Sequence, residues 1–170
     1  MDHIILEGFI GSGKATVGKK IAKDMALKLY EVEKMVSEKM KLSTADIHDK
    51  FGESYLRALE TSVLNDLLLL DERAVIIIGS DLPLMPFNAP YLEKLGRVYW
   101  LKASQSKIVA KIAKTKKYAW MQKDGMETRV GDMLAEREPA YEKIAAHVID
   151  METLSADEAA EVIEKLAVEG

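Results

Sequence analysis

A glycine-rich loop near the amino terminus holds the residues best suited to chemistry. Gly8, Gly13 and Lys14 match the pattern G-x-x-x-x-G-K-[ST] in every position but the last. Glycines let a backbone with positive φ approach phosphate oxygens, and the helix that follows points the positive end of its dipole at them. We therefore predict that the loop binds nucleotide phosphates and that Lys14 reaches the outer ones as a point charge.

The segments on either side of the loop support this prediction. His3–Glu7 is a short strand-like run, and beyond the loop apolar residues recur at near-helical spacing. Those apolar residues are Val17, Ile21, Met25 and Ala26. A strand, a glycine loop and a helix favour a phosphate site over the alternative, a glycine turn that opens an ordinary helix.

The loop lacks one group that a phosphate site of this kind normally has. Ala15 stands where a serine or threonine hydroxyl would ligate Mg²⁺. Thr16 does not simply replace that hydroxyl, because one helical residue turns the side chain by about 100°.

Two acidic residues follow the first helix. A strand is predicted over residues 28–33, with Glu31 and Glu33 at its end. Alternation would put both carboxylates on one side, at the edge where open α/β sheets bind ligands. The start of a solvated acidic helix is an equally good interpretation of these residues.

The rest of the chain alternates between strands and helices. Strands are predicted at 74–78, 97–101 and 146–149, and helices at 34–40, 43–52, 53–70, 104–114, 127–143 and 155–168. Ser43, Ser104 and Ser155 are expected to cap the helices that they begin, and Ser155 with Glu158 to form a capping box. Pro139 should bend or interrupt the helix at 127–143.

In the helix at 53–70 an apolar stripe is expected in the core: Tyr55, Leu56, Leu59, Val63, Leu67 and Leu70. Arg57 and Glu60 share another face of this helix, and their simplest interpretation is a solvent-exposed ion pair.

Residues 114–125, KTKKYAWMQKDG, are basic and aromatic and have little helical patterning. We predict a mobile lid there and call these residues the lid segment. The alternative is a solvated surface loop, in which Trp120 and Met121 would be unusual.

Composition narrows the class of protein. A chain of 170 residues, 48% of them hydrophobic, suits one domain, and a net charge of −4 argues against nucleic acid as the main partner. There is no cysteine to form disulfides or ligate metal. No aliphatic run approaches the roughly 20 residues that span a membrane, and no signal segment follows Met1. We expect a cytoplasmic protein that acts on a small molecule, as a monomer or weak homo-oligomer.

Four segments in order resemble the shikimate kinase family across essentially the whole chain. GFIGSGKATVG is similar to the family's phosphate loop, and GESYLRALE to its G-E-x-x-F-R-x-x-E segment, with leucine for phenylalanine. VIIIG is similar to the strand before its three-glycine turn, and REPAYEKIA to its R-x-P-x-Y-x-x-x-A segment.

This resemblance implies a P-loop NTPase-type α/β/α fold with a five-stranded parallel sheet and a lid, built as one domain over residues 1–170. It implies ATP and Mg²⁺ as cofactors and a place in aromatic amino acid biosynthesis. The implied ATP-binding residues are Gly8, Gly11, Ser12, Gly13, Lys14, Ala15, Thr16 and Lys114.

The resemblance also implies roles at the acceptor site, where the substrate is an anionic hydroxy acid. Arg57 and Arg137 would hold its carboxylate, Glu60 would support Arg57, and Gly79 would begin the substrate turn. Three residues would act in catalysis: Lys14 on the phosphates, Glu33 orienting or deprotonating the hydroxyl, and Lys117 closing from the lid. Glu31 would help to hold Mg²⁺.

Several positions depart from the family pattern. The D-x-D motif is Glu31-Val32-Glu33, and Ser80 and Asp81 replace the second and third glycines of the turn. The lid's R-P-L is absent, with lysines 116 and 117 in its neighbourhood. Because Asp81 would repel a bound carboxylate, we expect its side chain to point away or to face the metal.

Two functions are compatible with these residues. The first is a kinase that moves the γ-phosphate of ATP to a hydroxyl of shikimate or a similar small hydroxylated carboxylic acid. The second is a catalytically weakened paralogue that binds nucleotide or an acidic metabolite as a binding or regulatory protein. The retained Lys14, Arg57, Glu60 and Arg137 favour the kinase.

Overall fold

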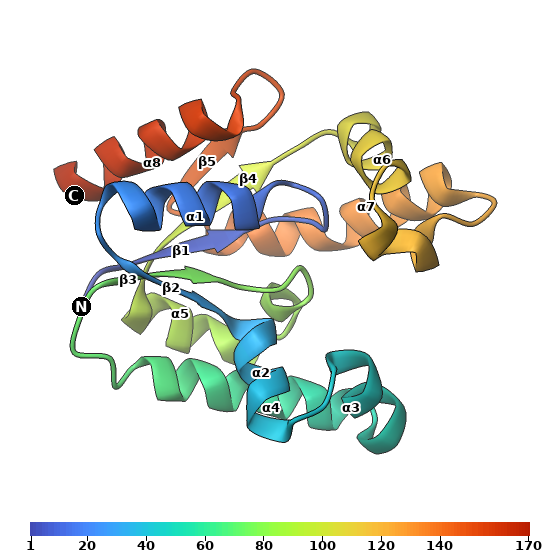
Figure 1. The fold of residues 1–170 in the computed structure, drawn as a ribbon, viewed down its shortest axis with the longest axis horizontal. Helices are drawn as coiled ribbons and strands as arrows, with labels where there is room; N and C mark the ends of the chain where they lie inside the picture. Colours follow the sequence, from blue (N-terminus) through green and yellow to red (C-terminus); the bar gives the residue numbers. More distant parts are fainter.

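The computed structural model describes residues 1–170 as a five-stranded sheet between two layers of helices (Figure 1). The strands are β1 (His3–Glu7), β2 (Lys28–Glu31), β3 (Ala74–Ile77), β4 (Gly96–Lys102) and β5 (His147–Asp150). They lie in the order β2-β3-β1-β4-β5, and every neighbouring pair is parallel. The predicted α/β/α fold with five parallel strands is confirmed.

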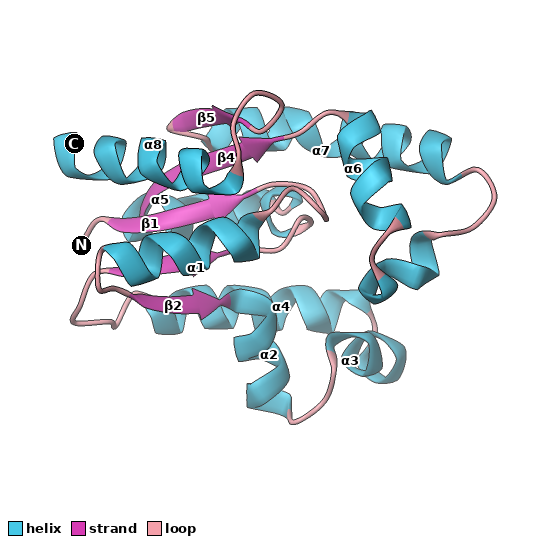
Figure 2. Ribbon diagram, turned by 45° about the horizontal axis from the view of Figure 1, so that its top comes forward, coloured by secondary structure: helices cyan, strands magenta, loops and turns pink.

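Eight α-helices and three short 3-10 helices lie between the strands and after the last one. The α-helices are α1 (Lys14–Asp24), α2 (Val32–Met40), α3 (Thr44–Phe51), α4 (Glu53–Leu67), α5 (Ala89–Leu95), α6 (Gln105–Ala113), α7 (Met126–Ile144) and α8 (Ala156–Glu169). The 3-10 helices are η1 (Leu82–Leu84), η2 (Pro86–Asn88) and η3 (Lys116–Met121). Helices α1 and α8 cover one face of the sheet, and α4, α5 and α7 cover the other (Figure 2).

The central strand β1 separates two hydrophobic cores. Its side chains alternate between faces, so that Ile4 and Leu6 pack with α1 and α8 while Ile5 packs with α4 and α5. β3 continues both cores with residues that are fully or almost fully buried. Strands buried on both faces are continuous aliphatic runs, which is why these segments could be predicted from sequence.

All five strands point toward the same edge of the sheet, and the chain termini lie at the opposite edge (Figure 1). The loops after β1 and β3 and the start of α2 meet at that carboxyl edge. Parallel strands therefore bring together residues that are far apart in sequence, as open α/β sheets do at their ligand sites.

Helix starts follow the predicted caps. The Oγ atoms of Ser43, Ser104 and Ser155 accept hydrogen bonds from the backbone N–H groups three residues later. Ser155 and Glu158 form the predicted capping box.

Two predictions about the elements are wrong in detail, and a third is narrowed. β2 ends at Glu31, so Glu33 lies in the first turn of α2 and not on the strand. Of the bend or interruption predicted at Pro139, the interruption is absent: α7 continues through this residue, whose missing N–H falls on the exposed face, while Leu134 and Tyr141 are buried on the other. Tyr55, expected in the core, is 41% exposed and packs on Phe51.

No helix in the protein combines the length and the hydrophobicity that a membrane crossing requires.

Candidate active site

Residues 8–13, which we call the phosphate loop, connect β1 to α1, and their glycines have the backbone geometry that the sequence predicts. Gly11 and Gly13 have φ values of 81° and 101°, where side chains with a Cβ are strained. A Cβ at Gly8 would lie 2.5 Å from Ser12 Oγ. Gly13 caps α1 without a side-chain hydrogen bond, so the first N–H groups of the helix remain available to an anion.

Lys14 projects from the first turn of α1 toward the end of β3. Its Nζ donates hydrogen bonds to the carbonyl oxygens of Gly8, at 2.7 Å, and Ile78, at 3.2 Å. Burial lowers the pKa of Lys14 to about 8, although the nearby carboxyl groups of Glu33, Glu7 and Asp81 oppose the shift. Lys14 thus lies between the phosphate loop and the turn that follows β3.

Glu7 is a site residue that the sequence analysis did not identify. It is fully buried at the end of β1, and neither carboxylate oxygen has a hydrogen-bond partner. Burial raises its pKa to about 9, so the side chain is neutral at pH 7. A glutamate that ends an otherwise aliphatic strand, directly before the glycine loop, was the available signal.

The two acidic residues after the first helix are held by different partners. Glu31 Oε2 lies 2.6 Å from Lys34 Nζ, and Glu33 Oε1 accepts a hydrogen bond of 3.3 Å from Thr44 Oγ1. The expectation of two carboxylates side by side on a strand is therefore wrong, since the chain turns into α2 at Val32. The alternative of an acidic helix start describes Glu33.

Arg57 and Arg137, which are 80 positions apart in the sequence, meet at one carboxylate. Arg137 Nε and Nη2 lie 2.9 Å and 2.6 Å from Asp81 Oδ1, and Arg57 Nη2 lies 3.2 Å from Asp81 Oδ2. Arg57 Nη1 also donates a hydrogen bond of 2.6 Å to Glu60 Oε1. We call Arg57, Glu60, Asp81 and Arg137 the arginine cluster.

The expectation that Asp81 points away from the arginines is wrong. Two guanidinium groups this close repel one another, and a carboxylate between them removes that repulsion while forming charge-assisted hydrogen bonds. The exposed-pair interpretation of Arg57 and Glu60 is wrong too, because their side chains are only 13% and 12% exposed. Burial raises the pKa of Glu60, Arg57 opposes this shift, and the charges of Asp81 and Glu33 add to it.

The turn that carries Asp81 is fixed on both sides. Tyr141 Oη donates a hydrogen bond of 2.6 Å to the Ser80 carbonyl, and Asn88 Nδ2 donates one of 3.0 Å to the Leu82 carbonyl. Gly79 begins this turn, and a Cβ there would lie 3.9 Å from Glu60 Oε2, at ordinary contact distance. A cavity of about 640 Å³ shares Arg57 with the arginine cluster; it lies between α4 and the segment after η1 and is lined by Glu53, Ser54, Arg57, Ala58, Thr61, Met85 and Phe87.

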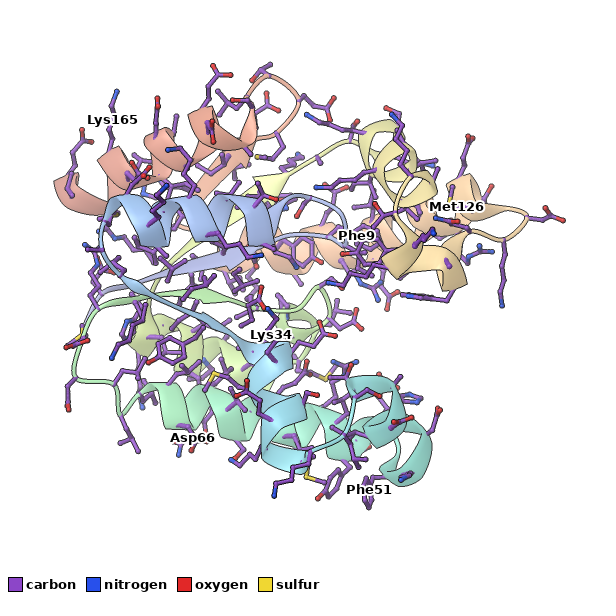
Figure 3. All side chains as sticks on the ribbon, viewed as in Figure 1. Phe9, Lys34, Phe51, Asp66, Met126 and Lys165 are labelled. Carbon is purple, nitrogen blue, oxygen red and sulfur yellow. The ribbon has the colours of Figure 1, made fainter.

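The lid segment is partly ordered by a hydrophobic anchor. Met121 is 1% exposed and packs with Phe9 of the phosphate loop and with α6 and α7, whereas Trp120 is 60% exposed. Figure 3 shows Phe9 at the carboxyl edge of the sheet, on the side of α6 and α7. The segment contains η3, so it has more local structure than the sequence pattern indicated.

The lid lysines lie at different places relative to the loop. Lys117 is near enough that its positive charge contributes to the lowered pKa of Lys14, after burial as the main cause. Lys114 caps the end of α6 and is exposed. Lys111, which was not predicted from the sequence, reaches the loop from α6: its Nζ is 3.9 Å from the position that a Cβ on Gly13 would occupy.

The remaining predicted residues lie in the loop or in the first turn of α1. Ser12 is buried and its Oγ has no hydrogen-bond partner. Ala15 and Thr16 are exposed in the first turn of α1, and Ala15 offers no oxygen to a metal.

A glycine loop with the geometry of a phosphate site, beside two arginines paired with acidic side chains and on a parallel sheet of this strand order, defines a P-loop small-molecule kinase. The family model for shikimate kinase matches residues 10–167. The chain therefore belongs to the shikimate kinase family.

Individual members of the family match this chain along nearly its full length. A shikimate kinase from Caldanaerobacter subterraneus subsp. tengcongensis is 36% identical over 163 residues, which cover 96% of this chain and 94% of the relative. One from Thermoanaerobacter pseudethanolicus is 34% identical over 165 residues, or 97% and 95% of the two chains. The structure of shikimate kinase from Acinetobacter baumannii in complex with shikimate has a TM-score of 0.89 at 25% identity and covers 99% of this chain and 94% of its own. These matches favour the kinase over the regulatory alternative.

Proposed function

We propose that this protein transfers the γ-phosphate of ATP to a hydroxyl of shikimate or a similar small hydroxylated carboxylic acid. The observation that carries this proposal is the hydrogen bond from Lys14 Nζ to the Ile78 carbonyl. Ile78 is three residues before Asp81, so this bond connects the phosphate loop with the arginine cluster. The phosphates of the donor would bind at the loop, and the carboxylate of the acceptor would bind at the arginine cluster.

The proposed roles follow from charge and position. Lys14 binds the outer phosphates and neutralises charge that develops during transfer, and Lys111 and Lys117 add positive charge from the lid side. Glu33 is electrostatically coupled both to Lys14 and to Glu60, which suits a residue that orients or deprotonates the acceptor hydroxyl. Arg57 and Arg137 bind the carboxylate, and Glu60 fixes Arg57.

One carboxylate, that of Glu31, together with the phosphates of ATP would suit a hydrated Mg²⁺. Mg²⁺ usually keeps several waters and takes only one or two protein carboxylates together with substrate phosphates. Glu31, at the end of β2, is the residue that would hold it, directly or through water, in place of the hydroxyl missing at Ala15. The ion would neutralise phosphate charge and orient the transferred group.

The wider setting is part of the same proposal. We propose a single cytoplasmic domain that acts as a monomer or weak homo-oligomer, without nucleic acid or membrane partners, in the shikimate pathway of aromatic amino acid biosynthesis. The lid segment, residues 114–125, would close over the nucleotide.

The test is coupled ADP release with ATP, Mg²⁺ and shikimate, beside a panel of polyhydroxy acids and nucleoside monophosphates. We expect turnover with shikimate or another hydroxylated acid and none with nucleoside monophosphates. ADP release with a nucleoside monophosphate alone, or with no acceptor, would refute the proposal.

A further inference from the structure

Asp81 makes the contacts that a bound carboxylate would make. Its two oxygens engage separate arginines, Oδ1 with Arg137 and Oδ2 with Arg57, at 2.6 to 3.2 Å. We propose that the Asp81 side chain is a tethered competitor for the acceptor's carboxylate and thereby sets the enzyme's affinity for acidic acceptors. This proposal rests on the proposed function, which assigns the two arginines to the acceptor.

The charges in the cluster explain why an acid must displace Asp81. Two guanidinium groups contribute +2, and the carboxylates of Glu60 and Asp81 contribute −2, so the cluster as it stands carries no net charge to attract an anion. A carboxylate entering beside Asp81 would bring a third negative charge. Once Asp81 turns away, the four-residue cluster loses one negative charge and both arginines have free donors. The carboxylates of Glu53 and Glu136 also contact these arginines, but their side chains are 66% and 67% exposed, so solvent screens their charge.

Of the two acids, only Asp81 is placed to leave. Glu60 lies within α4 and its side chain is 12% exposed, whereas Asp81 lies on a turn and its side chain is 36% exposed. The neighbouring carbonyls of Ser80 and Leu82 are held by Tyr141 and Asn88. The backbone can therefore stay in place while the Asp81 side chain rotates toward solvent.

The same contacts hold Asp81 close to its partners when no acid competes. Tyr141 and Arg137 are one turn apart on α7, so a single helix both fixes the turn and pairs with its carboxylate. A group held in this way acts at an effective concentration of roughly millimolar or more. A free acid at lower concentration must compete against it, which weakens its apparent affinity.

The experiment compares Asp81→Asn with Glu136→Gln. Asparagine keeps the size of Asp81 but removes its charge. Glu136 Oε2 lies 3.3 Å from Arg137 Nη1, and the Glu136 side chain is 67% exposed. Glu136→Gln therefore removes a negative charge that contacts Arg137, but it leaves Asp81 in place between the two arginines. Calorimetry without nucleotide measures shikimate binding, and steady-state kinetics measures KM for shikimate and for ATP.

We expect Asp81→Asn to lower the Kd and the KM for shikimate by tenfold or more, with KM for ATP changed less than twofold. Glu136→Gln should change all three less than twofold. Asp81→Gly should also lower the Kd and the KM for shikimate. It replaces Asp81→Asn in the comparison if circular dichroism shows that asparagine disturbs folding.

Two results would overturn the inference. One is an unchanged shikimate Kd in both Asp81 variants; the other is no measurable binding in any variant, since freed arginines would then not accept a carboxylate. A separate readout covers the proposed function: tighter shikimate binding in Asp81→Asn without ADP release from any variant would refute the kinase assignment and leave the role of Asp81 intact.

Discussion

The phosphate loop and the arginine cluster lie on adjacent loops of the same sheet edge but are built differently. The loop depends on backbone geometry at Gly11 and Gly13 and on one lysine held by two carbonyls. The cluster depends on four side chains from α4, α7 and the turn after β3, and it carries its own counter-charge in Asp81. In the loop, the backbone N–H groups have no competing acid. In the arginine cluster, a single acidic residue, Asp81, already occupies the donors that an anion would need.

The largest effect should come from removing the lysine of the loop. Lys14→Ala should weaken ATP binding by about 1.5 to 3 kcal/mol, the range for a charge-assisted contact, and leave shikimate binding nearly unchanged. Calorimetry of both ligands measures the difference. Lys19→Ala, an exposed neighbour on α1, is the control, and equal ATP affinity in Lys14→Ala and the parent would rule out the loop as a phosphate site.

The arginine cluster should show the opposite selectivity. Arg57→Ala or Arg137→Ala should weaken acid binding by about 1 to 2 kcal/mol, because a charge-assisted contact is lost but Asp81 competes less well too. ATP affinity should hardly change. Arg73→Ala, which removes an arginine bound to Asp2 at the far edge of the sheet, is the control. If every acid in the panel binds these variants normally, the carboxylate site lies elsewhere.

Burying Glu7 beside the glycine loop should lower the free energy of unfolding, and a substitution of this residue measures by how much. Its pKa is about 9 in the folded protein and ordinary in the unfolded chain, so its ionisation favours unfolding increasingly from about pH 4.5 to pH 9. Glu7→Gln removes that penalty but still buries a polar group without a partner, and the net gain at pH 7 should be about 1 kcal/mol.

Thermal melts from pH 5 to 8.5 measure this effect. The advantage of Glu7→Gln over the parent should grow as pH rises, and Glu38→Gln, at an exposed position, should show no such trend. A difference that stays constant across this range would mean that Glu7 is ionised in the folded protein.

The smallest effect should come from restoring the missing hydroxyl. Ala15→Ser should lower the Mg²⁺ concentration needed for half-maximal activity about two- to threefold, since it adds one oxygen ligand. Adding Glu31→Gln should then cost less activity than it does alone. An unchanged metal titration in folded Ala15→Ser would show that this position does not contact the ion.

Much of this architecture could be predicted from the sequence because the signals are local. Aliphatic runs specify β1 and β3, serine caps specify the starts of α3, α6 and α8, and positive φ at Gly11 and Gly13 follows from the glycine loop. Errors arose where two local interpretations were equally good, as at Glu33, where the chain enters α2 one residue after β2 ends.

The sequence by itself determined the geometry around Lys14, because a strand, a glycine loop and a helix position this residue within some 20 residues. Only the tertiary structure decided the state of the arginine cluster. Arg57, Asp81 and Arg137 come from three separate elements, and their contacts depend on how α4 and α7 pack against the sheet. From charge alone Asp81 looked like a group that would avoid the acceptor site. The packing instead places it between two guanidiniums, where a carboxylate is stabilised and not repelled.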